Sequence, residues 1–127
     1  MQQSRGVTLV SRIGCALLLA AITFGVYGAS LRNGFVEWDD GYLITENVHI
    51  RSITPLTLRH IFTTYDPELY IPLTFLSYQI DHLFWGLNPA GFHLTNLVLH
   101  TLNAVLVFVL MSLLLSGKNL SPLPLKG

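Results

Sequence analysis

Two long apolar segments without a charged residue constrain this chain more than any other feature. They cover residues 13–31 and 89–116. Nineteen residues of α-helix, at about 1.5 Å per residue, span roughly 28 Å, which matches the hydrocarbon core of a bilayer. Only 11% of the 127 residues are charged, whereas a soluble domain has about 25%. The sequence therefore predicts an all-α membrane protein with two transmembrane helices, 13–31 and 89–116.

The flanks of these segments support the assignment. Asn88 is a favourable N-cap, Pro89 suits a first helical turn, and Gly117 follows the second segment as a stop signal. The first segment has an alternative interpretation as a cleaved signal peptide, because basic residues precede it and small residues follow it. Tyr27 suits a cleavage site poorly, so we favour a retained anchor.

The distribution of charge predicts the orientation. The net charge is zero, but all seven acidic residues lie between positions 37 and 81; residues 32–91 carry three basic and seven acidic residues (−4), and the flanks carry +4. Basic flanks favour the cytoplasmic side. We therefore expect cytoplasmic ends at 1–12 and 117–127 and a periplasmic or lumenal loop at 32–88, in a bacterial inner membrane or the endoplasmic reticulum. Nothing in this balance points to nucleic acid.

The loop 32–88 is too rich in apolar and aromatic residues to be a simple tether. Short helices are predicted near 55–63, where Thr54 and Pro55 form a cap and first turn, and near 72–85. The second of these carries one apolar stripe, with Gln79 and Asp81 off it. The stripe comprises Leu73, Leu76, Ile80, Leu83 and Phe84. Helices of this kind suit a membrane surface or the underside of a larger domain.

Asp39 and Asp40 are the most informative polar pair, because they lie a few residues beyond the first span and next to Trp38. Two adjacent carboxylates could bind a divalent cation. One of them could act as a general base. The third interpretation is a polar turn that caps the next segment and keeps the loop in water. The residues alone favour the polar turn, since such pairs are common on surfaces.

A polar face runs along the first half of the second span. It consists of His93, Asn96, His100 and Asn103, at spacings of three, four and three. Hydrogen bonding to partner helices outside this chain is the simpler interpretation, and the wall of a polar cavity is the alternative. No zinc signature accompanies the histidines. The single cysteine, Cys15, excludes an internal disulfide.

Three strings in order carry a family resemblance. They are NGFVEWDDGYLITEN from Asn33, IRSITPLTLRHIFT from Ile50, and YIPLTFLSYQIDHLFWGLNPAGFHLTNLVLHTLNAVL from Tyr70. Together they resemble the N-terminal segment of the transmembrane-and-tetratricopeptide-repeat O-mannosyltransferases and their bacterial relatives, which are membrane glycosyltransferases of the GT-C type.

The resemblance implies a function. Asp39 and Asp40 match the acidic pair of that group, and Asp40 is our choice for the base that activates the acceptor hydroxyl. The other carboxylate would position it or hold a metal, so a divalent cation is the one cofactor implied. The donor would be a sugar on a polyprenyl phosphate in the bilayer, and the acceptor a protein hydroxyl or a glycan.

The same resemblance implies more chain than is present. Such enzymes have many spans and tetratricopeptide repeats, whereas this sequence has two spans and no repeat. We therefore expect a fragment of a larger GT-C-like fold, not catalytic alone, that lacks further transmembrane helices. The alternative function is a small two-span membrane protein that pairs with partner helices through the polar face.

Overall fold

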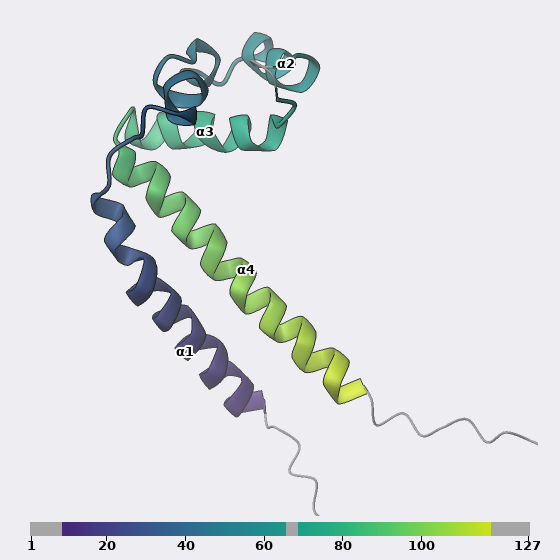
Figure 1. The fold of residues 1–127 in the computed structure, drawn as a ribbon. Coiled ribbons are helices and arrows are strands. Elements are labelled where there is room, and N and C mark those ends of the chain that lie inside the picture. Colours follow the sequence, from purple (N-terminus) through teal and green to yellow (C-terminus); the bar gives the residue numbers. More distant parts are fainter. Residues whose placement is uncertain (1–8, 66–68, 118–127) are drawn as a thin grey trace, which may run out of the picture. The chain divides into compact units, whose positions relative to one another are not determined.

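A computed structural model describes residues 9–65 and 69–117 of the chain. Within those ranges the structure is helical and has no strand, which confirms the predicted all-α fold (Figure 1). The predicted cytoplasmic ends lie largely outside the described residues. The elements in chain order are α1 (Leu9–Tyr27), η1 (Gly28–Arg32), η2 (Gly41–Thr45), η3 (Val48–Ile50), α2 (Pro55–Thr63), α3 (Pro72–Trp85) and α4 (Pro89–Gly117).

Two helical segments are long and apolar enough to cross a membrane, Leu9–Arg32 and Pro89–Leu115. This agrees with an integral membrane protein that has two spans. The first helix starts at Leu9, four residues before the predicted start at 13, and it therefore includes Arg12. An arginine is compatible with the end of a span because its aliphatic stem can lie along the apolar surface while the guanidinium reaches water.

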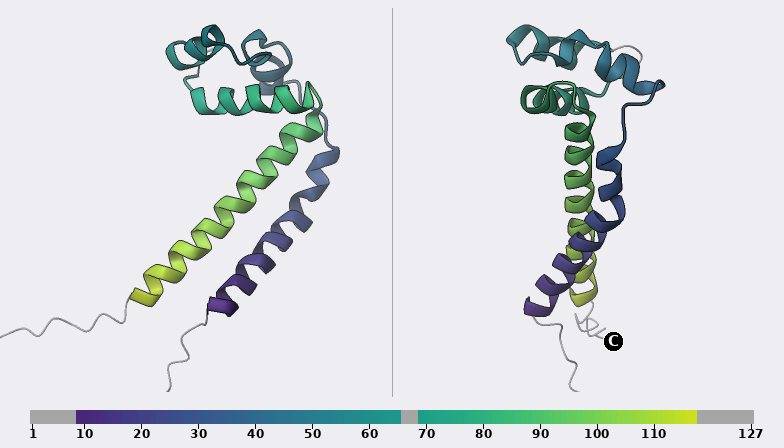
Figure 2. Two further views of the ribbon diagram at one scale, coloured as in Figure 1. Left: turned by 180° about the vertical axis from the view of Figure 1, so that it is seen from behind. Right: turned by 90° about the vertical axis from the view of Figure 1, so that its left-hand side faces the viewer.

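The described chain divides into two compact units, which are treated separately below. The first unit contains α1 and the part of α4 from Val98 onward, and the second contains residues 28–97. In the first unit α1 runs beside the later part of α4 (Figures 1 and 2). The buried side chains described there are two threonines, Thr23 and Thr101, while most of the leucine and valine side chains are exposed. That apolar surface requires lipid or other helices around it.

The second unit has a hydrophobic core of its own. Residues from five segments form it: Leu43, Ile44, Ile50, Ile61, Phe75 and Phe92. Ile50, Ile61 and Phe75 are almost completely buried. The second unit therefore folds as a small helical domain, whose core the loop supplies together with Phe92 from the beginning of α4.

Local signals fix where its helices begin. Thr54 and Thr57 form a reciprocal capping box at α2, with 3.1 Å from the Thr57 backbone N–H to the Thr54 hydroxyl. At α4, the Asn88 side-chain oxygen accepts a hydrogen bond of 3.1 Å from the backbone N–H of Ala90. These contacts satisfy N–H groups that have no partner within the helix.

The connection between α3 and α4 depends on two glycines. Gly86 ends α3 with φ of 60° and ψ of −128°, a conformation that side chains with a Cβ disfavour. Gly91 lies against the Trp85 ring so closely that a Cβ there would be 2.2 Å from Cγ of Trp85. The absence of a side chain at position 91 therefore permits the sharp change of direction between the two helices.

Helix α3 presents its apolar stripe outward. Leu73, Ile80 and Phe84 are exposed, whereas Gln79 and Asp81, the polar residues off the stripe, are buried. Phe75 is the deepest apolar side chain on the buried face. An exposed apolar stripe opposite a buried polar face is unfavourable in water, so α3 fits a membrane surface or another protein surface.

Candidate functional site

Asp40, just before η2, is tied to the backbone of the preceding loop. Its Oδ2 accepts a hydrogen bond of 2.9 Å from the backbone N–H of Val36. Its side chain is partly buried. Among the described residues, its other oxygen has no hydrogen-bond partner. One oxygen therefore fixes the orientation of the carboxylate while the second remains available to a substrate hydroxyl.

Asp39 is the more exposed member of the pair. Its Oδ1 accepts a hydrogen bond of 2.9 Å from the hydroxyl of Tyr42. Both aspartates thus have local partners three or four residues away, as in a polar turn. The side chain of Asp40, at the N-cap of η2, makes no capping hydrogen bond, so the expected capping of the next segment is not found there. These contacts hold the two carboxylates in place at the beginning of η2, and a structural role does not conflict with a chemical one.

Tyr78 of α3 interacts electrostatically with Asp39, Asp40 and a third carboxylate, that of Asp81. Burial raises the pKa of the Tyr78 phenol above its usual 10.0. The negative charges of Asp40, Asp81 and Asp39 raise that pKa further, in this order of strength. The phenol ring packs beside Phe75 and Phe92, with ring centroids 6.3 and 5.8 Å away. Tyr78 is therefore a neutral phenol and a potential proton donor within the field of three acidic groups.

Asp81, like Tyr78 and Thr95, is a residue of this region that the sequence did not single out as a candidate. It is only 4% exposed, and its Oδ1 accepts a hydrogen bond of 2.5 Å from the Thr95 hydroxyl of α4. Burial raises the pKa of Asp81, and the bond from Thr95 lowers it by a smaller amount. A carboxyl group in this environment holds a proton more readily than one in water.

One sequence signal could have identified the Asp81–Thr95 pair. The two positions are equally distant from Asn88 in the connection between α3 and α4, seven residues on either side. Residues placed symmetrically about a tight helix–helix connection tend to face each other. The apolar periodicity does not reveal this pair, because it describes the apolar stripe of α3 and leaves Asp81 off that stripe.

Helix α3 carries a buried amide, that of Gln79, in addition to the buried carboxyl group of Asp81. Gln79 is 1% exposed and donates a hydrogen bond of 2.9 Å from Nε2 to the backbone oxygen of His49. Its Oε1 is buried and has no hydrogen-bond partner among the described residues. This hydrogen bond joins α3 to η3, so Gln79 helps to hold these two elements of the second unit together.

The predicted polar face of α4 is present as a continuous helical stripe, but its members differ in environment. The Nε2 atom of His93 is buried and finds no hydrogen-bond partner within residues 9–65 and 69–117. Asn96 and Asn103 are exposed. His100 packs edge-on against Tyr27 within the first unit, with ring centroids 4.9 Å apart. Helical spacing therefore places these residues on one face, while the packing around each of them is separate.

The described residues contain no group of three or more His, Cys, Asp or Glu side chains that could hold a metal ion. Asp39 and Asp40 supply two carboxylates, whereas hard divalent cations take six or more oxygen ligands. The remaining ligands would have to come from water, a substrate phosphate or residues beyond those described. A cation at Asp39 and Asp40 therefore remains a prediction from the sequence.

The helical fold, with two candidate membrane spans and an acidic segment between them in the sequence, defines a class of integral membrane protein. Comparison with known proteins identifies a group within that class. The chain is 35% identical over 98 residues to mouse protein O-mannosyl-transferase TMTC1, covering 70% of this chain and 10% of that protein. It is 31% identical over 118 residues to Drosophila melanogaster protein O-mannosyl-transferase Tmtc1, covering 87% and 13% respectively.

A third relative, human protein O-mannosyl-transferase TMTC4, is 30% identical over 110 residues, which are 80% of this chain and 15% of that protein. No family model and no solved structure matches the chain. The resemblance to the transmembrane-and-tetratricopeptide-repeat O-mannosyltransferases is therefore confirmed. The chain spans only about 10–15% of the length of these relatives.

Proposed function

We propose that this chain carries the acidic part of a glycosyltransferase site, with Asp40 as the general base for an acceptor hydroxyl. The observation that carries the proposal is the hydrogen bond of 2.9 Å from the Val36 backbone N–H to Oδ2 of Asp40, which orients this carboxylate next to Asp39 just before η2. The three relatives reported above are all named as protein O-mannosyl-transferases, and this supports a sugar-transfer reaction.

The chemistry requires a positioned base. An acceptor hydroxyl loses its proton as its oxygen attacks the anomeric carbon, and a carboxylate at hydrogen-bond distance can take that proton. Asp40 suits this role because its Oδ2 is held by the Val36 backbone N–H and its second oxygen is not engaged by the described residues. Asp39 would then position Asp40 or the acceptor.

The donor in this proposal is a sugar on a polyprenyl phosphate. The phosphate leaves in an ionised form and needs little help from an acid, so a single well-placed carboxylate is sufficient on the acceptor side. The acceptor is a protein hydroxyl or a glycan that approaches from the aqueous side of the loop. Further helices, from a longer chain or from partners, would complete the donor site.

The test transfers this loop into an active protein. Residues 33–92 would replace the matching segment of a full-length O-mannosyltransferase relative, and mannose transfer from a polyprenyl-phosphate donor would be measured. We expect Asp40→Asn to lower turnover by about 10²-fold or more, the usual contribution of a general base. Asp39→Asn should lower it as well, and the acceptor KM should change less than kcat.

Glu37→Gln is the matched control, because it removes an exposed carboxylate two residues before Asp39. It should leave transfer unchanged. Hydrogen-exchange protection of α3 would show that each chimera retains its loop fold. Turnover at the unsubstituted level in both aspartate variants would overturn the assignment.

A second function, helix pairing, is favoured by the exposure of Asn96 and Asn103 on α4. Exposed amides on a span stabilise contacts with other helices. In this reading the chain forms an oligomer that weakens when both asparagines are replaced by leucine. A monomeric chain that is indifferent to the replacement would exclude it.

A further inference from the structure

Helix α2 carries a small pocket on its outer side, within the second unit, that the proposed base does not use. Its cavity volume is about 180 Å³, and the residues that line it are Leu56, Arg59, His60, Thr63 and Thr64. The first four share one helical face, because they follow each other at positions i, i+3, i+4 and i+7. Leu58 and Ile61, which α2 contributes to the core, lie on the other face. A substitution in the pocket therefore leaves the core intact.

Arg59 is the cation of this pocket, and its guanidinium is available to a ligand. Its side chain makes no hydrogen bond or ion pair with any residue in 9–65 or 69–117. The Thr63 hydroxyl donates to the backbone oxygen of Arg59, at 2.7 Å, and does not engage the guanidinium. Arg51 of the same unit differs, since its guanidinium donates to the backbone oxygens of Thr45 and Asn47. Arg59 can therefore bind an external anion without giving up an internal contact.

The other lining residues add one donor and two walls. Thr64 ends α2, and its backbone N–H donates to the backbone oxygen of His60 at 2.9 Å. The Thr64 hydroxyl has no hydrogen-bond partner in the described part of the chain. The His60 ring stacks on His49 of η3, with ring centroids 3.6 Å apart, so it forms a fixed wall. Leu56 is exposed and forms an apolar rim.

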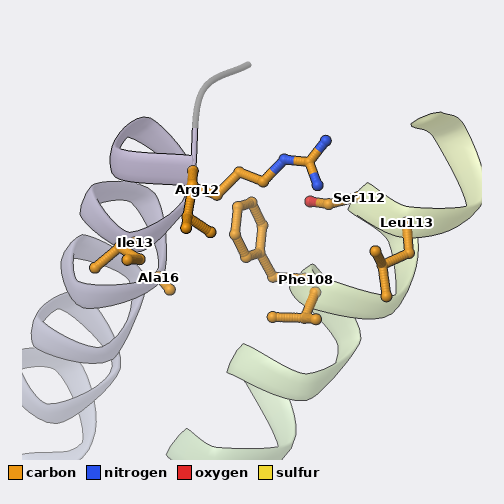
Figure 3. Close-up of a pocket in the computed structure, with 8 residues that line it drawn as sticks. Arg12, Ile13, Ala16, Phe108, Ser112 and Leu113 are labelled. Atoms are coloured by element: carbon orange, nitrogen blue, oxygen red, sulfur yellow. The ribbon is translucent and has the colours of Figure 1, made fainter. Parts of the chain in front are cut away.

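A larger pocket in the first unit does not offer comparable groups. It lies between α1 and the later part of α4 and has a volume of about 240 Å³. Figure 3 shows its Arg12 side chain extending toward Ser112, with Phe108 beside them. Arg12 and Ser112 both have interaction partners in the structure already. The pocket on α2 is therefore the better candidate for a charged ligand.

Size and charge select that ligand. The volume of about 180 Å³ is smaller than the roughly 300–1,000 Å³ of sites for drug-sized molecules, so the pocket suits a single side chain. One guanidinium matches one carboxylate, which it can hold through two parallel hydrogen bonds. A phosphate carries more charge and is commonly held by a cluster of arginines. Residues 32–91 contain three basic and seven acidic residues, −4 in total, which also disfavours a dianion. A neutral sugar would leave the charge of Arg59 unused.

We propose that this pocket binds the side-chain carboxylate of an acidic residue in a peptide, with Arg59 as its ion-pair partner and the Thr64 hydroxyl as a second donor. Leu56 contacts the neighbouring residue of that peptide. The peptide is the segment around the acceptor hydroxyl, so the pocket favours protein acceptors that have an acidic residue near the site of transfer. Only the identification of the peptide with the acceptor rests on the proposed function.

Two peptides that differ in one residue provide the measurement. The full chain, in phosphatidylcholine nanodiscs, would be titrated with a short peptide of serine, threonine and one central glutamate, and with its glutamine counterpart. We expect the glutamate peptide to bind about fivefold more tightly, the upper end of what an exposed ion pair contributes. It should shift the Nε–Hε NMR signal of Arg59. The corresponding signal of Arg51, whose Nε donates to the Asn47 backbone oxygen, should not move.

Three variants and one control test the site. Arg59→Gln should abolish the preference for glutamate, since it removes the charge. Arg59→Lys should retain a part of it, because an ammonium keeps the charge but cannot form the two parallel hydrogen bonds. Thr64→Val should weaken binding of the glutamate peptide by about two- to threefold, the loss of one hydrogen bond. Arg32→Gln, which removes another exposed cation of the second unit, should retain the full preference. Hydrogen-exchange protection of α2 and α3 shows that each variant is folded.

Four results would overturn the proposal. Equal affinity for the two peptides would show that no carboxylate is recognised. A loss of preference in Arg32→Gln as strong as in Arg59→Gln would indicate general attraction by surface charge. Tighter binding of inorganic phosphate, with the same shift of the Arg59 signal, would assign the pocket to phosphate. A shift of that signal in Asp66→Asn with Glu68→Gln, without peptide, would show that the chain supplies its own carboxylate. Because binding requires no sugar donor, none of these results depends on Asp40 acting as the base.

Discussion

In the spans most apolar side chains are exposed, whereas the loop buries a small set of its apolar side chains in a core. The described buried residues of the first unit are Thr23 and Thr101, and those of the second include Ile50 and Phe75. This difference indicates which interactions stabilise each unit. The spans depend on lipid or neighbouring helices, while the loop has a core that its own sequence supplies.

Helix α3, which has fourteen residues, carries apolar side chains on a buried face and also on an exposed face. Its buried face holds Phe75 with Gln79 and Asp81, and its exposed face holds Leu73 and Phe84. Burial of a carboxyl group is costly unless it gains a partner, which Thr95 provides. A buried carboxyl group with a raised pKa and one hydrogen-bond partner is a candidate for proton chemistry.

The largest expected effect tests whether the loop core is independent of the spans. Phe75→Ala removes a side chain that is 1% exposed and should lower the opening free energy of the loop by about 3–5 kcal/mol. Leu73→Ala, on the same helix but 73% exposed, should change it by less than about 0.5 kcal/mol. Hydrogen exchange of α2 and α3 measures both values. A comparable loss in α1 after Phe75→Ala would break the distinction between the units.

A smaller effect is expected at the close approach of Trp85. In Gly91→Ala the added methyl group would lie 2.2 Å from Cγ of the Trp85 ring. We expect this overpacking to lower the stability by about 1–3 kcal/mol. Gly14→Ala in α1 is the matched change in the spans, since nothing lies within 4 Å of its added Cβ, and it should be neutral or stabilising. The double variant Gly91→Ala with Trp85→Ala should recover part of the loss. Without such recovery, the ring contact is not the cause.

The smallest effect concerns the pH dependence of the loop. The pKa of Asp81 is raised in the folded state, so the folded loop binds more protons than the unfolded loop in the window just above the usual 3.8. Stability therefore decreases as the pH rises through that window. Asp81→Asn should become progressively more stabilising, relative to the unsubstituted chain, as the pH rises, by about 1.4 kcal/mol for each unit of pKa difference.

Hydrogen exchange of α3 at several pH values measures this trend. Thr95→Val should make it steeper, since the hydrogen bond that lowers the Asp81 pKa is lost. A difference between Asp81→Asn and the unsubstituted chain that does not vary with pH would show that Asp81 ionises as it does in the unfolded state. The contrast between a buried and an exposed carboxylate in this loop would then disappear.

Much of the helical architecture could be read from the sequence. Short helices were predicted near 55–63 and 72–85, and the structure has α2 at Pro55–Thr63 and α3 at Pro72–Trp85. Caps and prolines made this possible, because the Thr54 hydroxyl and the Asn88 amide satisfy nearby backbone groups regardless of tertiary contacts. Helix α1 begins at Leu9, so it extends beyond the uncharged segment 13–31 and includes Arg12.

Only a part of the candidate site can be predicted from the sequence. Asp39 and Asp40 were chosen from the sequence and the family resemblance, and their roles remain a proposal. Tyr78, Asp81 and Thr95 were not chosen. Their relation depends on the turn at Gly86 and on how α4 packs against α3, and neither feature is visible in the periodicity of a single helix.

The sequence by itself determined the apolar spans, the acidic loop between them and the ends of the loop helices, because each depends on hydrophobicity or on contacts within a few residues. Only the tertiary structure decided that the polar face of α3 is buried and that Asp81 meets Thr95. A helical pattern states which residues share a face, but burial depends on what packs against that face. In a chain that contacts water, lipid and its own core, an apolar stripe does not reveal which of the three it meets.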